Sequence, residues 1–152
     1  MKFRWAALSL VLALSALVTE SAAAQGSGQT RQGRGPGALG QNHPNPFNPE
    51  TTIPFSVGLE GMPPACTDPA KTYRVSLRIY NVLAQVVAIP ILQGGGGQSG
   101  RPIQNLQLTC GQFDAWWDGK VAGGREAASG VYAYQLEIDG RIVASRKMLV
   151  VK

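Results

Sequence analysis

The sequence predicts an all-β protein, and more specifically an antiparallel β-sandwich of about seven short strands. Several segments alternate apolar and polar residues with the period of two that is typical of half-buried strands. Turn-forming residues separate these segments, and no segment shows a convincing amphipathic helical period. A small β-barrel is the alternative architecture.

The first 24 residues have the organisation of a secretory signal peptide. Lys2 and Arg4 precede an apolar run over residues 5–18, and alanines at 22–24 supply the small residues needed for cleavage. The run is short for a membrane span, and no second apolar stretch follows it. We therefore expect an exported mature chain without a transmembrane segment. It would be secreted or on the outer cell surface, with the periplasm as a transit stage or an alternative location.

Residues 25–44 are predicted to form a flexible glycine-rich linker. The stretch from Gly26 to Gly40 has no apolar period and few side chains to bury, so burial cannot offset the entropy of ordering it. The folded domain is then expected to occupy residues 45–152, an ordinary domain size.

Residues 51–57 predict the first strand of this domain. Ile53, Phe55 and Val57 fall on one face, and Pro54 lies between them. Because proline cannot donate to a strand ladder, we expect this strand at a sheet edge or paired on one side only.

The next segments alternate between strands and turns. Residues 73–80 give the clearest alternation in the chain, and a turn over 81–85 leads into a more continuously apolar strand over 86–92. Four adjacent glycines at 94–97 indicate a loop, because ordering them costs much backbone entropy.

Four further strands complete the prediction, over residues 106–110, 113–119, 131–138 and 141–151. Asp139-Gly140 separates the last two and is a strong signal for a hairpin with a primed turn.

Trp116 and Trp117 occupy adjacent strand positions, so their rings should face opposite sides of the sheet. We expect one of them in the core. The other is either covered by the loop that begins at the four glycines or exposed, where it could stack on a sugar ring.

Cys66 and Cys110 are the two cysteines of the chain. Because an exported chain meets an oxidising compartment, we predict that they form a disulfide, with two buried thiols as the alternative.

The charge pattern argues against nucleic acid as a partner. The formal net charge is +5, but the arginines are spread over separate segments. Nucleic-acid binding usually requires a concentrated basic stripe.

No residue pattern predicts a catalytic site or a metal site. His43 is the single histidine and has no serine or cysteine partner in view. Asp114 and Asp118 are the nearest carboxylate pair, and nothing in the spacing singles out Asp118 and Glu126 as the paired acids of a glycoside hydrolase. We therefore expect a protein that is not an enzyme and that carries no cofactor or metal.

Five motifs occur in order along the chain: NPFNPETTIPFSV (45–57), LRIYNVLAQVV (77–87), WDG (117–119), ASGVYAYQL (128–136) and RKMLVVK (146–152). As an ordered set they closely resemble the type A carboxyl-terminal sorting domain of type IX secretion cargo. This family is similar in fold to the immunoglobulin-like domain of the flagellar hook-cap protein. The resemblance covers residues 45–152.

The resemblance implies an immunoglobulin-like sandwich carried on exported proteins of the Bacteroidetes and related phyla. It also implies recognition by the type IX secretion machinery, for which such a domain is the address for outer-membrane translocation. By motif, it assigns a leading signature, a central turn, a penultimate strand and a basic terminal strand. These contain Asn45, Pro46, Phe47, Asn48 and Pro49; Trp117, Asp118 and Gly119; Gly130, Val131 and Tyr132; and Lys147, Met148 and Lys152.

The proline-rich start of the domain is expected to be a stiff, extended lead, because Pro44, Pro46 and Pro49 restrict themselves and the residues before them. Phe47 is expected to plug the end of the sandwich. Asn45 and Asn48 are expected to cap free backbone groups by local hydrogen bonds.

The chain departs from the family in three respects. Ala84 stands where the family turn normally carries glycine, which leaves a left-handed backbone there open. The two cysteines lie in stretches longer than the family's usual loops, which suggests that they join two insertions. Only a short tether, with no cargo domain, separates the expected signal peptide from the domain.

Two other functions fit the same sequence. One is a structural or adhesive immunoglobulin-like subunit that binds a protein partner through an exposed edge strand. The other is a carbohydrate-binding module that uses an exposed tryptophan to bind a polysaccharide. A remnant of a longer exported protein is a further interpretation.

Overall fold

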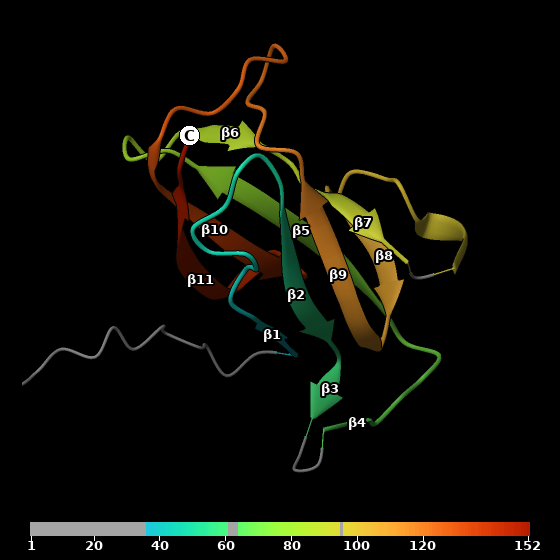
Figure 1. Cartoon of the computed structure of the whole chain (residues 1–152). Coiled ribbons are helices and arrows are strands. Elements are labelled where there is room, and N and C mark those ends of the chain that lie inside the picture. Colours follow the sequence, from blue (N-terminus) through green and yellow to red (C-terminus); the bar gives the residue numbers. More distant parts are fainter. Residues whose placement is uncertain (1–35, 61–63, 95) are drawn as a thin grey trace, which may run out of the picture.

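The computed structural model describes residues 36–60, 64–94 and 96–152, and these form an all-β structure (Figure 1). The predicted signal peptide and the predicted linker up to residue 35 lie outside the described residues. The strands are β1 (Gly37–Leu39), β2 (Thr51–Val57), β3 (Leu59–Glu60), β4 (Ala65–Cys66), β5 (Thr72–Tyr80), β6 (Val86–Ala88), β7 (Ile91–Gln93), β8 (Leu106–Thr109), β9 (Gly111–Trp117), β10 (Gly130–Ile138) and β11 (Arg141–Val150). A short 3-10 turn, η1, covers Gly96–Gln98.

The strands form two main antiparallel sheets. One has the order β1-β2-β9-β7, and the other has the order β11-β10-β5-β6, with β8 also paired to β5. β3 and β4 form a small separate hairpin. The prediction of an all-β antiparallel structure is therefore confirmed, and the described strands form separate sheets rather than one closed barrel.

The described residues contain more strands than the sequence predicts, because several strands are very short. β1, β3, β4, β6 and β7 have only two or three residues each. Segments of this length show no measurable period of two, so alternation does not reveal them.

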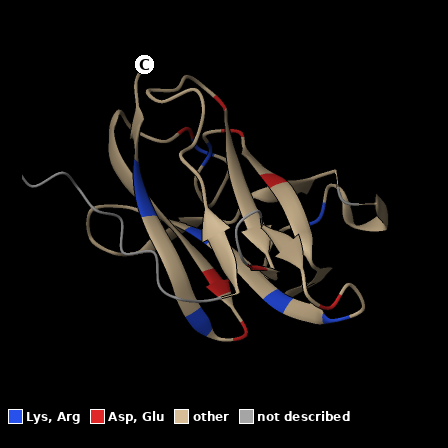
Figure 2. Ribbon diagram, turned by 90° about the horizontal axis from the view of Figure 1, so that it is seen from below, with Lys and Arg blue, Asp and Glu red and all other residues tan. Residues whose placement is uncertain are grey.

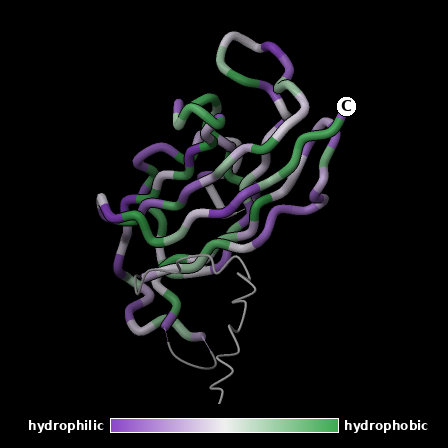
Figure 3. Tube along the Cα trace, turned by 90° about the vertical axis from the view of Figure 1, so that its left-hand side faces the viewer, coloured by the Kyte–Doolittle hydropathy of each residue, from purple (hydrophilic) through white to green (hydrophobic). Residues whose placement is uncertain are grey.

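Side chains from both sheets form one hydrophobic core. Ile53, Phe55 and Val57 of β2 and the alternating Val75, Leu77 and Ile79 of β5 are all buried. Alternation of apolar and polar residues along the strands is visible in Figure 3. The predicted inward faces are therefore confirmed.

The predicted boundary between linker and domain needs correction. Gly37–Leu39 form β1, which pairs with β2, and Leu39 is buried in the core. His43 continues this pairing with Thr52, through reciprocal amide-to-carbonyl bonds of 2.9 Å. The folded unit thus includes part of the predicted linker, because Leu39 is buried and the segment pairs with β2 although it has no apolar period.

β2 is also placed differently from the prediction, since it lies between β1 and β9 rather than at an edge. Pro54 is tolerated there because its nitrogen faces the end of β1. The amide of Gly40 donates to the Pro54 carbonyl oxygen, and the carbonyl oxygen of Gly40 accepts from the Tyr134 hydroxyl instead of from a strand amide. The donor that proline lacks is thus replaced by a side chain.

The predicted single strand over 86–92 is divided in two. β6 pairs with β5 in one sheet, whereas β7 pairs with β9 in the other. Pro90 lies between them and cannot donate a hydrogen bond to a ladder, so the chain crosses between the sheets at this point.

Two turns have the left-handed residues that they require. Asp139 and Gly140 both have positive φ, which confirms the predicted primed hairpin between β10 and β11. Ala84 has a φ of 58°, so the turn between β5 and β6 keeps a left-handed residue although it lacks glycine. The Asn81 side chain stabilises this turn by accepting from the amides of Leu83 and Gln85.

The predicted disulfide is present between Cys66 and Cys110. It joins the end of β4 to the residue between β8 and β9. The disulfide therefore joins the β3–β4 hairpin to the segment between β8 and β9.

Candidate functional site

The motif segments meet at one end of the molecule, around the end of β11. We call residues 45–49, 117–119, 130–132 and 147–152 together the motif cluster. In Figure 1 the loop before β2, the end of β9 and the end of β11 lie at this same end. Hydrogen bonds and ring contacts join all four segments, as follows.

Phe47 is the centre of the motif cluster. Its side chain is 1% exposed, and its ring centroid lies 5.3 Å from that of Trp117. The Trp117 ring in turn contacts Tyr132 in an edge-to-face arrangement at 5.8 Å. The prediction that Phe47 plugs one end of the core is consistent with this burial, and the three rings form one aromatic group.

The backbone of Phe47 runs parallel to the end of β11. Its amide donates to the Leu149 carbonyl oxygen at 3.0 Å, and the Val151 amide donates to the Phe47 carbonyl oxygen at 3.1 Å. The Asn45 side chain accepts from the Leu149 amide at 2.9 Å. Asn45 therefore satisfies a backbone group as expected, but one that is distant in sequence rather than local.

The proline-rich segment is a bent loop rather than the extended lead that the sequence predicts. The backbone bends at residues 44–46 and again at residues 48–49. Asn48 and the three prolines are exposed, whereas Phe47 is buried. The asparagine and the prolines of this segment are thus exposed, and the Phe47 side chain enters the core.

The WDG turn packs directly against this loop. Gly119 has a φ of 73°, and a side chain there would collide with the Pro49 carbonyl oxygen. The Asp118 carboxylate accepts from the Lys120 amide, and the Trp117 indole N–H donates to the Lys120 carbonyl oxygen at 2.8 Å. Glycine is therefore required both by its backbone conformation and by the close approach of the loop.

The terminal strand alternates between core and surface. Met148 and Val150 are buried, while Lys147 and Leu149 face outward. The Lys152 amine pairs with the exposed Glu126 carboxylate at 2.9 Å, and this bond lowers the pKa of Glu126. The basic end is thus tied to the loop that follows the WDG turn.

At the start of β10, Tyr132 and Val131 point to opposite sides of the sheet. Tyr132 faces the core, and its hydroxyl donates to the Ala128 carbonyl oxygen at 3.1 Å. Gly130 begins β10 with a φ of 150°, and Val131 is exposed.

A second set of residues, whose contacts no motif or period in the sequence marks, fastens the segment before the motif cluster. The buried Tyr134 hydroxyl donates to the Gly40 carbonyl oxygen and accepts from the Asn42 amide, both at 2.9 Å. Burial raises the pKa of Tyr134, against the opposing effects of the Asn42 bond and the Arg146 charge. Arg146 donates to the Leu39 carbonyl oxygen at 2.7 Å. Asn42 and Leu39 lie in a glycine-rich stretch, so no periodic signal marks them.

The remaining candidate residues are dispersed. His43 is exposed and takes part in the backbone bridge to Thr52, and Asp114 lies on the outer side of β9. Asp118 and Glu126 have the separate partners given above. Among the described residues, no three His, Cys, Asp or Glu side chains are grouped as a metal site would require. In the same residues, no helix has the length and apolarity to cross a membrane.

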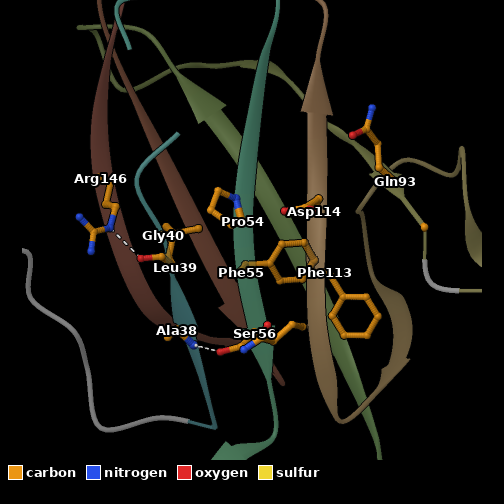
Figure 4. Close-up of a pocket in the computed structure, with 12 residues that line it drawn as sticks. Ala38, Leu39, Gly40, Pro54, Phe55, Ser56, Gln93, Phe113, Asp114 and Arg146 are labelled. Atoms are coloured by element: carbon orange, nitrogen blue, oxygen red, sulfur yellow. Dashed lines mark hydrogen bonds between the residues drawn. The ribbon is translucent and has the colours of Figure 1, made fainter. Parts of the chain in front are cut away.

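The two adjacent tryptophans lie on opposite sides of β9, as predicted. Trp117 is buried and Trp116 is half-buried on the outer side, where its indole N–H donates to the Glu50 carboxylate at 3.2 Å. An open hollow of about 700 Å³ lies over β1, β2 and β9 on this sheet (Figure 4). Asp114 and Gln93 lie toward one side of it, and Arg146 lies at the other.

Charged residues of the described chain are spread over several elements (Figure 2). Arg78 and Glu137 form the shortest ion pair, at 2.7 Å.

Comparisons with known proteins add little to this geometry. No family model matches the sequence, and no curated protein matches it. One solved structure is similar, a Pseudomonas fluorescens alkylpurine DNA glycosylase, AlkC, bound to DNA containing an abasic site analog. The match has 10% sequence identity and a TM-score of 0.47, and it covers 78% of this chain and 31% of the glycosylase chain.

This match bears on one prediction made from the sequence. The glycosylase is an enzyme, and the prediction that the present chain is not an enzyme is not kept. At this TM-score and identity, the likeness carries no argument about the reaction, substrate or partner of the present chain.

Proposed function

We propose that this chain carries an immunoglobulin-like sorting domain that the type IX secretion machinery recognises, so that the exported protein is delivered across the outer membrane. One observation supports this proposal above the others. Segments of four of the five motifs that resemble the sorting family, at residues 45–49, 117–119, 130–132 and 147–152, meet in one cluster around the end of β11.

The physical basis of recognition would be a rigid end of the domain. The Phe47 backbone is bonded to β11, Gly119 is packed on Pro49, and Lys152 is bonded to Glu126 and Ser129. Because these contacts hold the carboxyl-terminal strand in one conformation, a receptor could bind it without first ordering it, which reduces the entropic cost of binding.

Deletion of residues 147–152 in a type IX-competent host tests this proposal. We expect the intact protein at the cell surface or in the medium and the truncated protein in the periplasm, as measured by surface protease accessibility and immunoblotting of fractions. Protease resistance of the periplasmic protein shows whether it is still folded. Normal surface delivery of the truncated protein would contradict the proposal.

The edge-pairing alternative receives less support from the edge formed by β1 and β11. Arg146 bonds to the Leu39 carbonyl oxygen, and the Gln41 side chain donates to the Lys147 carbonyl oxygen. These bonds occupy backbone groups that a partner strand would need.

A carbohydrate-binding module is the second candidate function, favoured by the open hollow in Figure 4. Gln93, Gln112 and Asp114 offer hydrogen-bonding side chains there, and Trp116 lies two residues from Asp114 on the same side of β9. Titration with soluble polysaccharides while tryptophan fluorescence is recorded tests this function. Saturable quenching in the wild type that is lost in Trp116→Ala supports it, and an unchanged spectrum contradicts it.

A further inference from the structure

The outer side of the β5–β10–β11 sheet is divided into an apolar half and a polar half. In the half near the carboxyl terminus, Leu149 lies opposite Val131, and Ala133 lies opposite Tyr80. We call these four residues and Val82 the apolar face. In Figure 1 the turn between β5 and β6, which holds Val82, lies at the same end of the molecule as the end of β11.

The other half of this sheet surface is polar. Gln135 lies opposite Ser145 on one side and Arg78 on the other, and Arg78 is paired with Glu137. The apolar face is therefore a local feature of one end rather than a property of the whole sheet.

The apolar face is open to solvent although its residues are hydrophobic. The exposed fractions are 81% for Val82, 48% for Val131 and 38% for Leu149. Val82 and Val131 line a hollow of about 450 Å³, with Ala133 also in its lining. Contiguous exposed apolar residues beside a hollow are typical of interaction surfaces.

Core packing accounts for some residues of the motif cluster but not for Val131 and Lys147. Phe47, Trp117 and Met148 are buried, so their identity is explained by the fold. Val131 and Lys147 are exposed, and both line the same hollow. Their side chains contribute little to the core, which leaves binding as the role that fits them.

Lys147 gives the hollow its charge. It is the single charged residue among the described residues that line the hollow, and no described carboxylate forms a salt bridge with it. The Glu137 carboxylate, on the same outer side of β10, is already paired with Arg78. The surface thus combines an apolar area with one uncompensated positive charge.

We propose that the apolar face is the docking surface for a protein of the export machinery, whose contact region is apolar and supplies a carboxylate to Lys147. This inference rests on the proposed function and identifies the surface that the secretion machinery binds. A second copy of this chain fits less well, because a two-fold contact would bring together two such surfaces that lack a carboxylate. An anionic membrane surface attracts clusters of several cations, whereas this hollow has one.

Two substitutions on this sheet test the proposal in the full-length chain expressed in a type IX-competent host. Val131→Asp places a charge in the apolar face. Ile142→Asp is the matched control, because Ile142 is also an exposed apolar residue, 60% exposed on β11, but does not line the hollow. We expect surface delivery of Val131→Asp to fall at least tenfold, with that of Ile142→Asp unchanged. Equal thermal unfolding temperatures of the two purified variants exclude misfolding as the cause.

The charge is tested separately at Lys147. We expect Lys147→Glu to reduce delivery and Lys147→Arg to retain it. A photo-crosslinking residue at position 131 should form a discrete adduct with a component of the secretion machinery, and the same residue at position 142, outside the hollow, should not.

The results that would contradict the docking surface differ from those that would contradict the proposed function. Normal delivery of both Val131→Asp and Lys147→Glu, where wild-type delivery still depends on the type IX machinery, would overturn the docking surface and leave the proposed function standing. Wild-type delivery that is unchanged without the type IX machinery would overturn both. Two results with the purified secreted chain would also overturn the proposal: co-sedimentation with phosphatidylglycerol vesicles, or formation of a dimer in analytical ultracentrifugation, if either is lost in Val131→Asp.

Discussion

The amide of Phe47 donates a 3.0 Å hydrogen bond to the carbonyl oxygen of Leu149, so that the first and last motifs of the domain are neighbours in space. The Phe47 ring enters the core at the same point and contacts Trp117. One residue therefore combines backbone pairing with β11 and burial of an aromatic ring.

Substitution Phe47→Ala is expected to destabilise the domain by about 3–5 kcal/mol, because it removes a fully buried aromatic side chain and leaves a cavity beside Trp117. Urea unfolding followed by tryptophan fluorescence measures this change. The matched control is Asn48→Ala, an exposed neighbour, for which we expect a change within about 0.5 kcal/mol. Equal midpoints for the two variants would contradict the anchoring role of Phe47.

Gly119→Ala tests the contact between the WDG turn and the proline-rich loop. Gly123→Ala is the matched control, since Gly123 also has a positive φ but has no atom close to the position of an added side chain. Left-handed backbone costs an alanine about 1–2 kcal/mol at either site. We expect Gly119→Ala to cost clearly more than Gly123→Ala in the same unfolding assay, because only the former collides with Pro49. Similar costs would show that the loop is not held against the turn.

Tyr134→Phe removes the hydroxyl that joins the Gly40 carbonyl oxygen to the Asn42 amide. These backbone groups lose their partner, so we expect a loss of about 1–3 kcal/mol in the free energy of unfolding. Tyr80→Phe is the control, because the Tyr80 hydroxyl makes a longer bond of 3.3 Å to Gln135 at the surface. Faster hydrogen exchange of the Asn42 amide in Tyr134→Phe, with no change in Tyr80→Phe, would show that the lost stability comes from this hydrogen bond.

The raised pKa of Tyr134 also predicts a pH dependence. An unfolded tyrosine loses its proton near pH 10, whereas the folded protein holds the Tyr134 proton to higher pH. The contribution of Tyr134 to stability is therefore fully present below about pH 10 and is lost as the pH rises through the folded pKa. We expect stability to fall less steeply above pH 10 in Tyr134→Phe than in the wild type. Parallel curves would contradict this assignment.

Removal of the disulfide is expected to cost about 4 kcal/mol, because Cys66 and Cys110 close a long loop of the unfolded chain. The variant Cys66→Ser/Cys110→Ser and the reduced wild type should show the same loss in urea unfolding. Thiol labelling of the unreduced, unfolded wild type checks the bond directly, and stoichiometric labelling would show that it is absent.

The sequence predicts much of this structure where long alternating segments are involved. Residues 73–80 and 131–138 lie in strands with the expected inward faces, and the Asp139-Gly140 turn follows from its residue types. Pairing partners are harder to predict. Pro54 indicates an edge only if no side chain replaces its missing donor, and here the Tyr134 hydroxyl bonds to Gly40 instead.

The candidate site is predictable in its residues but not in its contacts. Asn45, Phe47 and Gly119 are marked by motif, yet their partners Leu149, Trp117 and Pro49 are set by tertiary packing. Alternation of apolar and polar residues does not mark Leu39 or Asn42, because each is a single buried residue in a glycine-rich segment. The predicted linker is therefore too long at its carboxyl end.

The most direct measurement of the central claim is the location of the full-length protein in two otherwise identical hosts, one with and one without a working type IX translocon. Protease added to intact cells should digest the protein, or the protein should be found in the medium, only in the host with the translocon. In the other host it should accumulate in the periplasm, protected from the protease. Equal surface exposure or release in both hosts would contradict recognition of this domain by the type IX machinery.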